Sequence, residues 1–197
     1  MEFDPGLGSF CAVILAGGRA ARLGGADKAS MEIAGRTLLA RALDAVVDAA
    51  EVVVVGEQVP TERPVTFTLE DPRYGGPAAA LLTGRDALLR TTTRLAVLAV
   101  DMPHVGAGTV RRLLAEAGDR DGAVLTDPGG KRQLALVVDP SRLDEVRPGH
   151  EDQHDLPLHR LLAPLDLAEV SAAGLEHRDV DTWADLRDAR STTGHHG

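Results

Sequence analysis

The most constraining feature of this sequence is a set of short, continuous apolar runs separated by segments with helical signals. The clearest runs are 11–15 (CAVIL), 51–56 (EVVVVG) and 95–100 (LAVLAV). Such runs, rich in β-branched residues, are typical of strands buried on both faces of a parallel sheet. Between them, 37–50 has the i, i+3, i+4 apolar spacing of an amphipathic helix, and Gly76-Pro77 opens another helix through about Arg90. This alternation predicts an open, mostly parallel α/β sheet.

Shorter segments continue the same pattern and complete the predicted domain. We expect further strands at 65–69, 123–126 and 134–138, and further helices at 108–117 and 155–162. With 197 residues the chain is long enough for one medium-sized domain with a sizeable core, which we assign to residues 1–190. The polar residues 191–197 are expected to form a disordered tail.

Composition and charge exclude several classes of protein. The formal net charge of −9 argues against a general surface for nucleic acid or for anionic membranes. The N-terminus lacks the pattern of a signal peptide, and no apolar run approaches the length of a membrane span. The single cysteine, Cys11, lies in the first apolar run and makes no intramolecular disulfide. We therefore expect a cytoplasmic protein.

A glycine-rich segment with cationic side chains follows the first predicted strand. The strand stops at Ala16-Gly17-Gly18, and Arg22 and Lys28 come shortly after it. Glycines let a backbone turn sharply and approach a ligand closely, and a turn rich in N–H groups beside positive charge suits a polyphosphate. The segment contains neither the dinucleotide-binding G-x-G-x-x-G nor the Walker pattern. The alternative is a tight turn followed by solvated cations.

A carboxylate directly follows the most apolar predicted strand. The run 95–100 ends in Asp101-Met102-Pro103. An unpaired buried charge is costly, so Asp101 requires a partner. A divalent cation such as Mg²⁺ is a natural one, because it prefers one or two carboxylates together with phosphate oxygens and water. The alternative is that Asp101 caps the turn that follows it.

Polar residues also follow the strand predicted at 65–69. Asp71 lies just beyond this strand, and Gly75-Gly76-Pro77 leads into a helix. Backbone N–H groups at a helix N-terminus can bind a base edge or an anion. The alternative is that Asp71-Pro72 and Gly-Gly-Pro only mark turns.

Two segments nearer the C-terminus carry further candidate ligands. Asp179 and Asp181 share one face if the chain is extended there, and Thr182 can cap a following helix. The segment 147–160 contains three histidines, but their spacing matches no zinc pattern. We therefore expect a solvated loop and helix there.

The motifs of the N-terminal third resemble those of a known family. The chain has L-A-G-G at 15–18, R-L-G at 22–24, D-K at 27–28 and a glycine, Gly35, before the next helix. This pattern resembles that of the molybdenum cofactor guanylyltransferases, the MobA-like NTP transferases. The resemblance implies a three-layer α/β/α, Rossmann-like, mostly parallel sheet of the nucleotidyltransferase (nucleotide-diphospho-sugar transferase) type.

The resemblance also implies roles for individual residues. It implies catalytic roles for Lys28, Arg22 and Asp101, and a Mg²⁺ site at Asp101 with Asp179 or Asp181. The nucleotide would be bound by Leu15, Ala16, Gly17, Gly18, Lys28, Asp71, Gly76, Pro77 and Asp101. The family usually has N-x-N-T-P-E near its C-terminus, whereas this chain has D-V-D-T-W-A, closer to the D-x-D-T-P-E of a related cytidylyl-transferring branch. The departure leaves open the choice between GTP and CTP, and which aspartate reaches the metal.

Three functions follow, in order of expectation. The first is transfer of GMP from GTP to the terminal phosphate of molybdopterin, which releases pyrophosphate and gives the guanine dinucleotide cofactor. The second is cytidylyl transfer to molybdopterin or nucleotidyl transfer to another small phosphate, and the third is a non-catalytic nucleotide-binding module. By resemblance the partners are GTP and molybdopterin, with transient contacts to other cofactor-biosynthesis proteins or molybdoenzymes, and with neither nucleic acid nor membrane. All enzymatic versions require Lys28 and Asp101 to face one another across a cleft.

Overall fold

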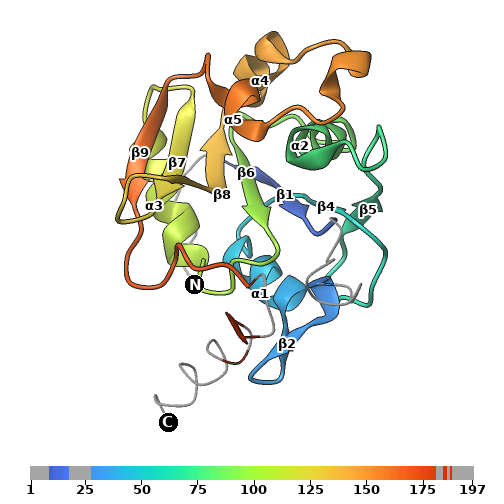
Figure 1. Cartoon of the computed structure of the whole chain (residues 1–197), viewed down its shortest axis with the longest axis vertical. Coiled ribbons are helices and arrows are strands. Elements are labelled where there is room, and N and C mark those ends of the chain that lie inside the picture. Colours follow the sequence, from blue (N-terminus) through green and yellow to red (C-terminus); the bar gives the residue numbers. More distant parts are fainter. Residues whose placement is uncertain (1–8, 18–27, 181–183, 186, 188–197) are drawn as a thin grey trace.

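The central feature of the fold is a seven-stranded sheet, shown in Figure 1. The structure is a computed structural model that describes residues 9–17, 28–180, 184, 185 and 187. The strand order is β5-β4-β1-β6-β8-β7-β9. The strands span β1 Cys11–Leu15, β4 Val52–Val55, β5 Thr66–Thr68, β6 Leu95–Ala99, β7 Gly122–Thr126, β8 Arg132–Val138 and β9 Leu167–Ser171.

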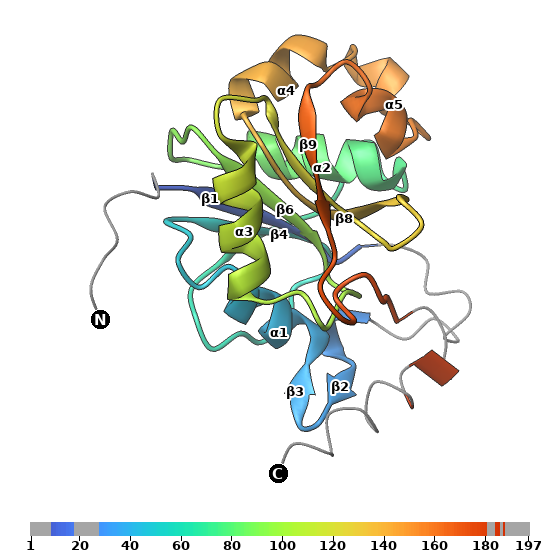
Figure 2. The ribbon, with the colours of Figure 1, turned by 90° about the vertical axis from the view of Figure 1, so that its left-hand side faces the viewer.

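Helices cover both faces of this sheet and give it three layers (Figure 2). One face packs against α1 (Leu38–Ala45) and α3 (Ala107–Ala117). The other packs against α2 (Gly76–Asp86), α4 (Pro140–Val146) and α5 (Leu158–Leu162). Because side chains alternate along a strand, Ile14 belongs to the first core and Val13 to the second. The predicted three-layer α/β/α fold is confirmed.

One half of the sheet, made of β5, β4, β1 and β6, is parallel and contains a switch in strand order. β1 pairs with β4 on one side and with β6 on the other, and β5 lies beyond β4. The chain therefore fills one side of β1 first and then crosses to its opposite side. In open α/β sheets the crevice beyond the carboxyl ends of the strands at such a switch point is the usual ligand site. The carboxyl ends of β1 and β6 meet there.

The second half of the sheet is not fully parallel. β8 is antiparallel to both β6 and β7, while β7 and β9 are parallel. The cause is local: β7 and β8 are joined by the short turn 127–131, in which Asp127 N–H donates to Lys131 O and Gly130 N–H donates to Asp127 O. A connection this short can join only antiparallel neighbours.

Several small elements were not predicted. They are the hairpin of β2 (Glu32–Ile33) and β3 (Arg36–Thr37), the 3₁₀ helices Lys28–Ser30 and His150–Gln153, the helix α4, and the strand β9. The hairpin turn has Ala34 and Gly35 at φ of 50° and 74°. Strands of two residues leave no period-2 signal, so the sequence pattern could not reveal them.

Some predicted helix bounds were wrong. The helix predicted at 37–50 ends at Ala45, and the one predicted through Arg90 ends at Asp86. The helix predicted from Asp155 begins at Leu158, because Asp155 has a φ of 55° that no helix accommodates. Among the described residues, the helices are too short or too polar to cross a lipid bilayer. The predicted tail 191–197 and Thr182 lie outside the part of the chain that the structure describes.

Candidate active site

A cleft of about 630 Å³ opens at the carboxyl ends of β1 and β6. It lies at the switch in strand order, where the predicted site residues were expected. Its walls come from the ends of β1 and β6, the loop between β5 and α2, the first turn of α2, and the loop before α5. The lining residues are Leu15, Gly17, Lys28, Glu70, Arg73, Tyr74, Gly76, Pro77, Ala80, Ala99, Val100, Asp101, Leu134, His154 and Asp155.

Lys28 and Asp101 form an ion pair on the wall of this cleft. Lys28 Nζ lies 2.9 Å from Asp101 Oδ2, and the two side chains are 20% and 23% exposed. Lys28 begins a 3₁₀ turn, whereas Asp101 lies two residues beyond the end of β6. The predicted proximity of Lys28 and Asp101, which are 73 residues apart in sequence, is therefore confirmed, but the two side chains contact each other directly and do not face one another across the cleft.

The turn after β1 is fixed to the neighbouring strand. The N–H groups of Ala16 and Gly17 both donate to the carbonyl of Val55, at 2.9 and 2.8 Å. These two amides hold the turn against β4 and do not point into the cleft. Leu15 and Gly17 line the cleft, but Ala16 is not among its described lining residues. Gly18 and Arg22 lie outside the described residues.

The loop between β5 and α2 needs its glycines where it enters the helix. A Cβ atom on Gly75 would lie 2.8 Å from the carbonyl oxygen of Pro72, and Gly76 has a φ of 88°. The turn brings Gly76 and Pro77, at the N-terminus of α2, to the wall of the cleft. A helix N-terminus carries partial positive charge, which favours a bound anion.

Asp71 lies away from this wall. Its carboxylate is exposed and its Oδ1 lies 3.4 Å from Nε2 of His150, while its backbone N–H and C=O both bond to the hydroxyl of Thr83. Among the described residues, the carboxylate that this loop gives to the cleft is that of Glu70. Because side chains alternate along an extended segment, neighbours in sequence face opposite ways.

The segment after β9 passes directly beside Asp101. The N–H of Val180 donates to the carbonyl of Asp101 at 2.9 Å, and the Val180 side chain is 1% exposed in the core. Asp179 is exposed beside this contact, and Asp181 lies outside the described residues. The fold thus brings Val180, and with it the neighbouring Asp179, to the backbone of Asp101.

The residues around Asp101 suit a divalent cation of the Mg²⁺ type. Asp101 offers hard carboxylate oxygens on the wall of an open cleft, and Asp179 lies in the segment bonded to its backbone. Mg²⁺ is held in this way, by one or two carboxylates together with phosphate oxygens and water. Within the described residues, no three acidic, histidine or cysteine side chains gather as a cage for a metal.

His104 follows Asp101 by three residues in the chain and lies near several cationic side chains. Burial, followed by the charges of Arg41, Arg178 and His177, lowers the pKa of His104 below its usual value. A cation is disfavoured both in a buried place and beside other cations. His104 is therefore uncharged near neutral pH.

Sequence reasoning missed a wall of the cleft formed by His154 and Asp155. The N–H of Asp155 donates to the carbonyl of Gly75 at 2.9 Å, which joins the loop before α5 to the N-terminus of α2. The histidines of this loop give a compositional signal, but their spacing fits no zinc site, so the sequence predicts a solvated loop and helix there. Only the contact between residues 75 and 155 reveals that it borders the site.

Known proteins resemble this chain in sequence over most of its length. Residues 12–171 match the family model described as the MobA-like NTP transferase domain. A molybdenum cofactor guanylyltransferase of Bradyrhizobium sp. (strain ORS 278) is 34% identical over 143 residues, which are 68% of this chain and 67% of that protein. The enzyme of the same name from Shewanella sediminis is 30% identical over 69% of this chain and 72% of that protein.

Solved structures share the fold at lower sequence identity. Rv0371c of Mycobacterium tuberculosis aligns with a TM-score of 0.75 and 19% identity over 94% of this chain and 99% of that one. Molybdopterin-guanine dinucleotide biosynthesis protein A of Archaeoglobus fulgidus aligns with a TM-score of 0.70 and 17% identity over 92% and 97% of the two chains. Rv0371c has also been solved as a complex with manganese. The family model covers most of the chain, and the cleft lies at the switch in strand order. The chain therefore belongs to the MobA-like NTP transferase family and is a nucleotidyltransferase.

Proposed function

We propose that this protein transfers GMP from GTP to the terminal phosphate of molybdopterin, releasing pyrophosphate and forming the guanine dinucleotide cofactor. The observation that carries the proposal is the Lys28–Asp101 pair on the wall of the cleft at the switch point of the sheet. The guanylyltransferase names of the similar proteins support the choice of substrates.

Lys28 is the residue we assign to the phosphates of the nucleotide. Its ammonium group is held by Asp101 at 2.9 Å, so little side-chain freedom is lost when it also donates to an anion. The N-terminus of α2, at Gly76 and Pro77, adds partial positive charge to the same cleft. Charge that builds up on the transferring and leaving phosphates would meet donors already in place, which is the main contribution a protein makes to such a transfer. Arg22 is proposed to assist them.

Asp101 is proposed to hold Mg²⁺, together with Asp179 or Asp181. A divalent cation held there would neutralise phosphate charge and polarise the phosphate oxygens. The backbone bond from Val180 to Asp101 supports the assignment, because it keeps the residue next to Asp179 at the backbone of Asp101. Leu15, Gly17 and Gly18 remain proposed contacts of the nucleotide. Ala16 is proposed to support the turn through its bond to Val55, and Asp71, which lies away from the cleft wall, is no longer assigned to the nucleotide.

The carboxylates of the cleft favour a guanine base. Glu70 and Asp155 both line it, and a carboxylate accepts two hydrogen bonds side by side. Guanine presents two adjacent donors on its pairing edge, whereas cytosine presents one amino group. Asp179-Val180-Asp181 remains the specific feature that favours the alternative, cytidylyl transfer.

The test is a comparison of donors with one acceptor. The purified protein is incubated with molybdopterin, Mg²⁺ and either GTP or CTP, and pyrophosphate release is measured. We expect GTP to be used at least about tenfold faster than CTP, since the loss of one hydrogen bond to a charged group costs a comparable factor. Faster use of CTP would overturn the choice of donor. Binding without pyrophosphate release would point to the non-catalytic module.

The proposal also covers the cellular location of the reaction and its protein partners. Both substrates are small phosphorylated molecules of the cell interior, so we propose a cytoplasmic location. Delivery of molybdopterin would involve transient contacts with other proteins of cofactor biosynthesis or with molybdoenzymes.

A further inference from the structure

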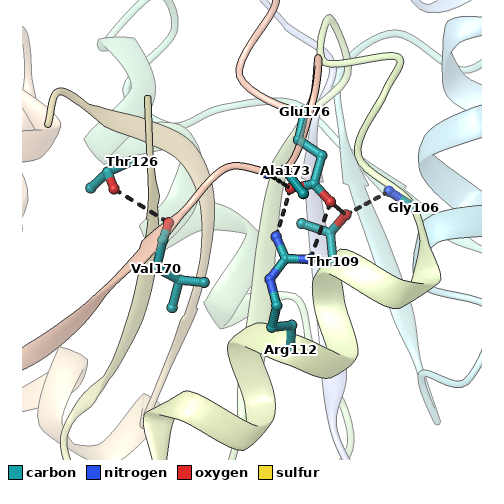
Figure 3. A network of polar contacts seen from close by, with 7 residues as sticks. All are labelled: Gly106, Thr109, Arg112, Thr126, Val170, Ala173 and Glu176. Carbon is teal, nitrogen blue, oxygen red and sulfur yellow. Dashed lines mark hydrogen bonds and ion pairs between the residues drawn. The ribbon is translucent and has the colours of Figure 1, made fainter. Parts of the chain in front are cut away.

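A network of polar contacts ties the segment after β9 to helix α3, and the mechanism above makes no use of it. Its centre is Glu176, which is only 9% exposed. Figure 3 shows the Glu176 side chain pointing from this segment toward α3, where Arg112 and Thr109 meet it. Burying a carboxylate costs free energy unless its oxygens accept hydrogen bonds. The burial of Glu176 therefore calls for a structural or functional reason.

Each carboxylate oxygen of Glu176 accepts two hydrogen bonds, which makes four in total. Oε1 accepts from the hydroxyl of Thr109 at 2.6 Å and from Nη1 of Arg112 at 3.4 Å. Oε2 accepts from Nη2 of Arg112 at 2.6 Å and from the N–H of Ala173 at 2.7 Å. Burial alone would raise the pKa of Glu176, but the hydrogen bonds from Arg112, Thr109 and the Ala173 N–H outweigh it and hold the pKa below its usual range. Glu176 is therefore an ionised anchor with fixed geometry.

The same segment makes further hydrogen bonds to the sheet and to Asp101 on either side of Glu176. On its N-terminal side, the N–H of Ala172 donates to the carbonyl of Thr126 at 2.8 Å, and the Thr126 hydroxyl donates to Val170 O (Figure 3). On its C-terminal side, the N–H of Val180 donates to the carbonyl of Asp101 at 2.9 Å. Only three residues separate Glu176 from Val180, so the place of Glu176 limits where Asp179 can lie.

We propose that Glu176 is a positioning residue of the nucleotidyl-transfer site. By fixing residues 173–176 on α3 it holds the backbone of 177–180 against Asp101, and thereby keeps the acidic motif that begins at Asp179 beside the cation site. The inference rests on the proposed function, since it assumes a divalent cation at Asp101. Glu176 touches neither nucleotide nor cation; it acts through the backbone that follows it.

The test is Mn²⁺ binding to the whole protein without nucleotide, measured by the electron paramagnetic resonance signal of free Mn²⁺. Glu176→Gln keeps the size of the side chain but removes the charge that pairs with Arg112. We expect its Kd for Mn²⁺ to rise about tenfold, the lower range for partners that orient a metal ligand. Hydrogen–deuterium exchange of the Val180 amide should accelerate in the same variant, while amides of β1 and β6 keep wild-type exchange.

Two further variants keep the test decisive. Arg112→Lys retains the charge but loses the two-pronged contact, so it should weaken Mn²⁺ binding in the same direction by a smaller factor even if Glu176→Gln folds poorly. Asp166→Asn is the matched control, because Asp166 pairs with Arg120 on an exposed surface, 65% and 54% exposed. It should leave both the Mn²⁺ Kd and the Val180 amide unchanged.

The outcomes separate this inference from the proposed function. Mn²⁺ binding by Glu176→Gln that equals wild type, or a Val180 amide that stays protected, would overturn the positioning role alone. Accelerated exchange throughout the chain would also overturn it, because the effect would then be general unfolding. Failure of the wild-type protein to bind Mn²⁺ would overturn the metal assignment of the proposed function, and with it this role.

Discussion

The two segments that meet at Asp101 are held in place by different balances of apolar and polar contacts. The strand β6 is buried between β1 and β8, and Leu95 to Leu98 are at most 2% exposed. The segment 172–180 consists mostly of exposed or half-buried residues. It is fixed by the four hydrogen bonds to Glu176, by single bonds from Ala172 and Val180, and by one fully buried apolar side chain, that of Val180.

The two segments of the site are therefore positioned mainly by different interactions. Apolar burial fixes Asp101 without any titratable group, so its place is set by the packing of the whole sheet. Polar anchoring fixes the second segment through a few directional bonds, which a single substitution or a change of pH can remove. The first arrangement is robust, and the second can be altered without unfolding the domain.

The largest effect is expected at the end of β6. Asp101→Asn keeps the size of the side chain but removes its charge, and with it the ion pair to Lys28 and the proposed metal ligand. We expect pyrophosphate release to fall about a thousandfold, the scale of losing a main electrostatic group of a site. The thermal midpoint, followed by circular dichroism, should stay close to wild type. Asp48→Asn, on an exposed pair with Arg111, is the control, and full activity of Asp101→Asn would disprove the assignment.

Lys28→Ala tests the other member of the pair. Turnover of GTP should fall by at least about a hundredfold, because a preorganised cation facing the phosphates is lost. Steady-state kinetics with saturating acceptor measure the effect. Arg111→Ala removes a cation from an exposed surface and should leave the rate unaltered. An unchanged rate in Lys28→Ala would make Lys28 a surface residue without a role in transfer.

Gly122→Ala challenges the packing of the sheet while leaving the cleft untouched. A Cβ atom at Gly122 would clash with the carbonyl of Val137 and lie 2.9 Å from the Cα of Val138, both on β8. We expect the free energy of unfolding in urea to fall by about 3 kcal/mol, at the upper end for overpacking, because backbone must move. GTP turnover at low temperature should change little.

The same substitution at an open position is the control for this loss. Gly108→Ala adds a methyl group to α3 where nothing lies within 4 Å, so it should stabilise the protein by about 0.5 kcal/mol. Equal effects of Gly122→Ala and Gly108→Ala on unfolding would show that the strand packing is not the cause.

The smallest effect is the pH dependence of the polar anchor. The pKa of Glu176 is lower in the folded protein than in the unfolded chain, so its stabilisation is complete above the unfolded pKa of about 4.3 and is lost as the pH falls through the folded pKa. Glu176→Gln should lower the free energy of unfolding by about 2 kcal/mol at pH 7, the scale of hydrogen bonds to a charged group. The difference from wild type should shrink below pH 4 in urea titrations. A difference that does not vary with pH would mean that the Glu176 charge does not stabilise the fold.

Much of the first region could be predicted from local sequence. The strands around Val13 and Val97 are continuous apolar runs, and such runs have little alternative to a buried sheet. Because parallel strands end at the same edge, the predicted meeting of Lys28 with Asp101 followed from the strand pattern and the motifs that end each strand.

The second region could not be predicted in this way. β9 and α4 carry weak periodic signals, and the antiparallel place of β8 depends on pairing partners that lie far apart in sequence. Glu70 and Asp155 reach the cleft through side-chain alternation and through a backbone contact to Gly75. None of these contacts has a signal within a single window of sequence.

The sequence by itself determined the layered α/β class, the family, and the residues Lys28 and Asp101, because strand burial and the motifs at strand ends are local properties. The tertiary structure alone decided that Glu70 rather than Asp71 faces the cleft, that the loop of His154 borders it, and that Glu176 anchors the segment leading to Asp179. Those choices depend on hydrogen bonds between residues as far apart as 109 and 176, and such bonds exist only once the chain is folded.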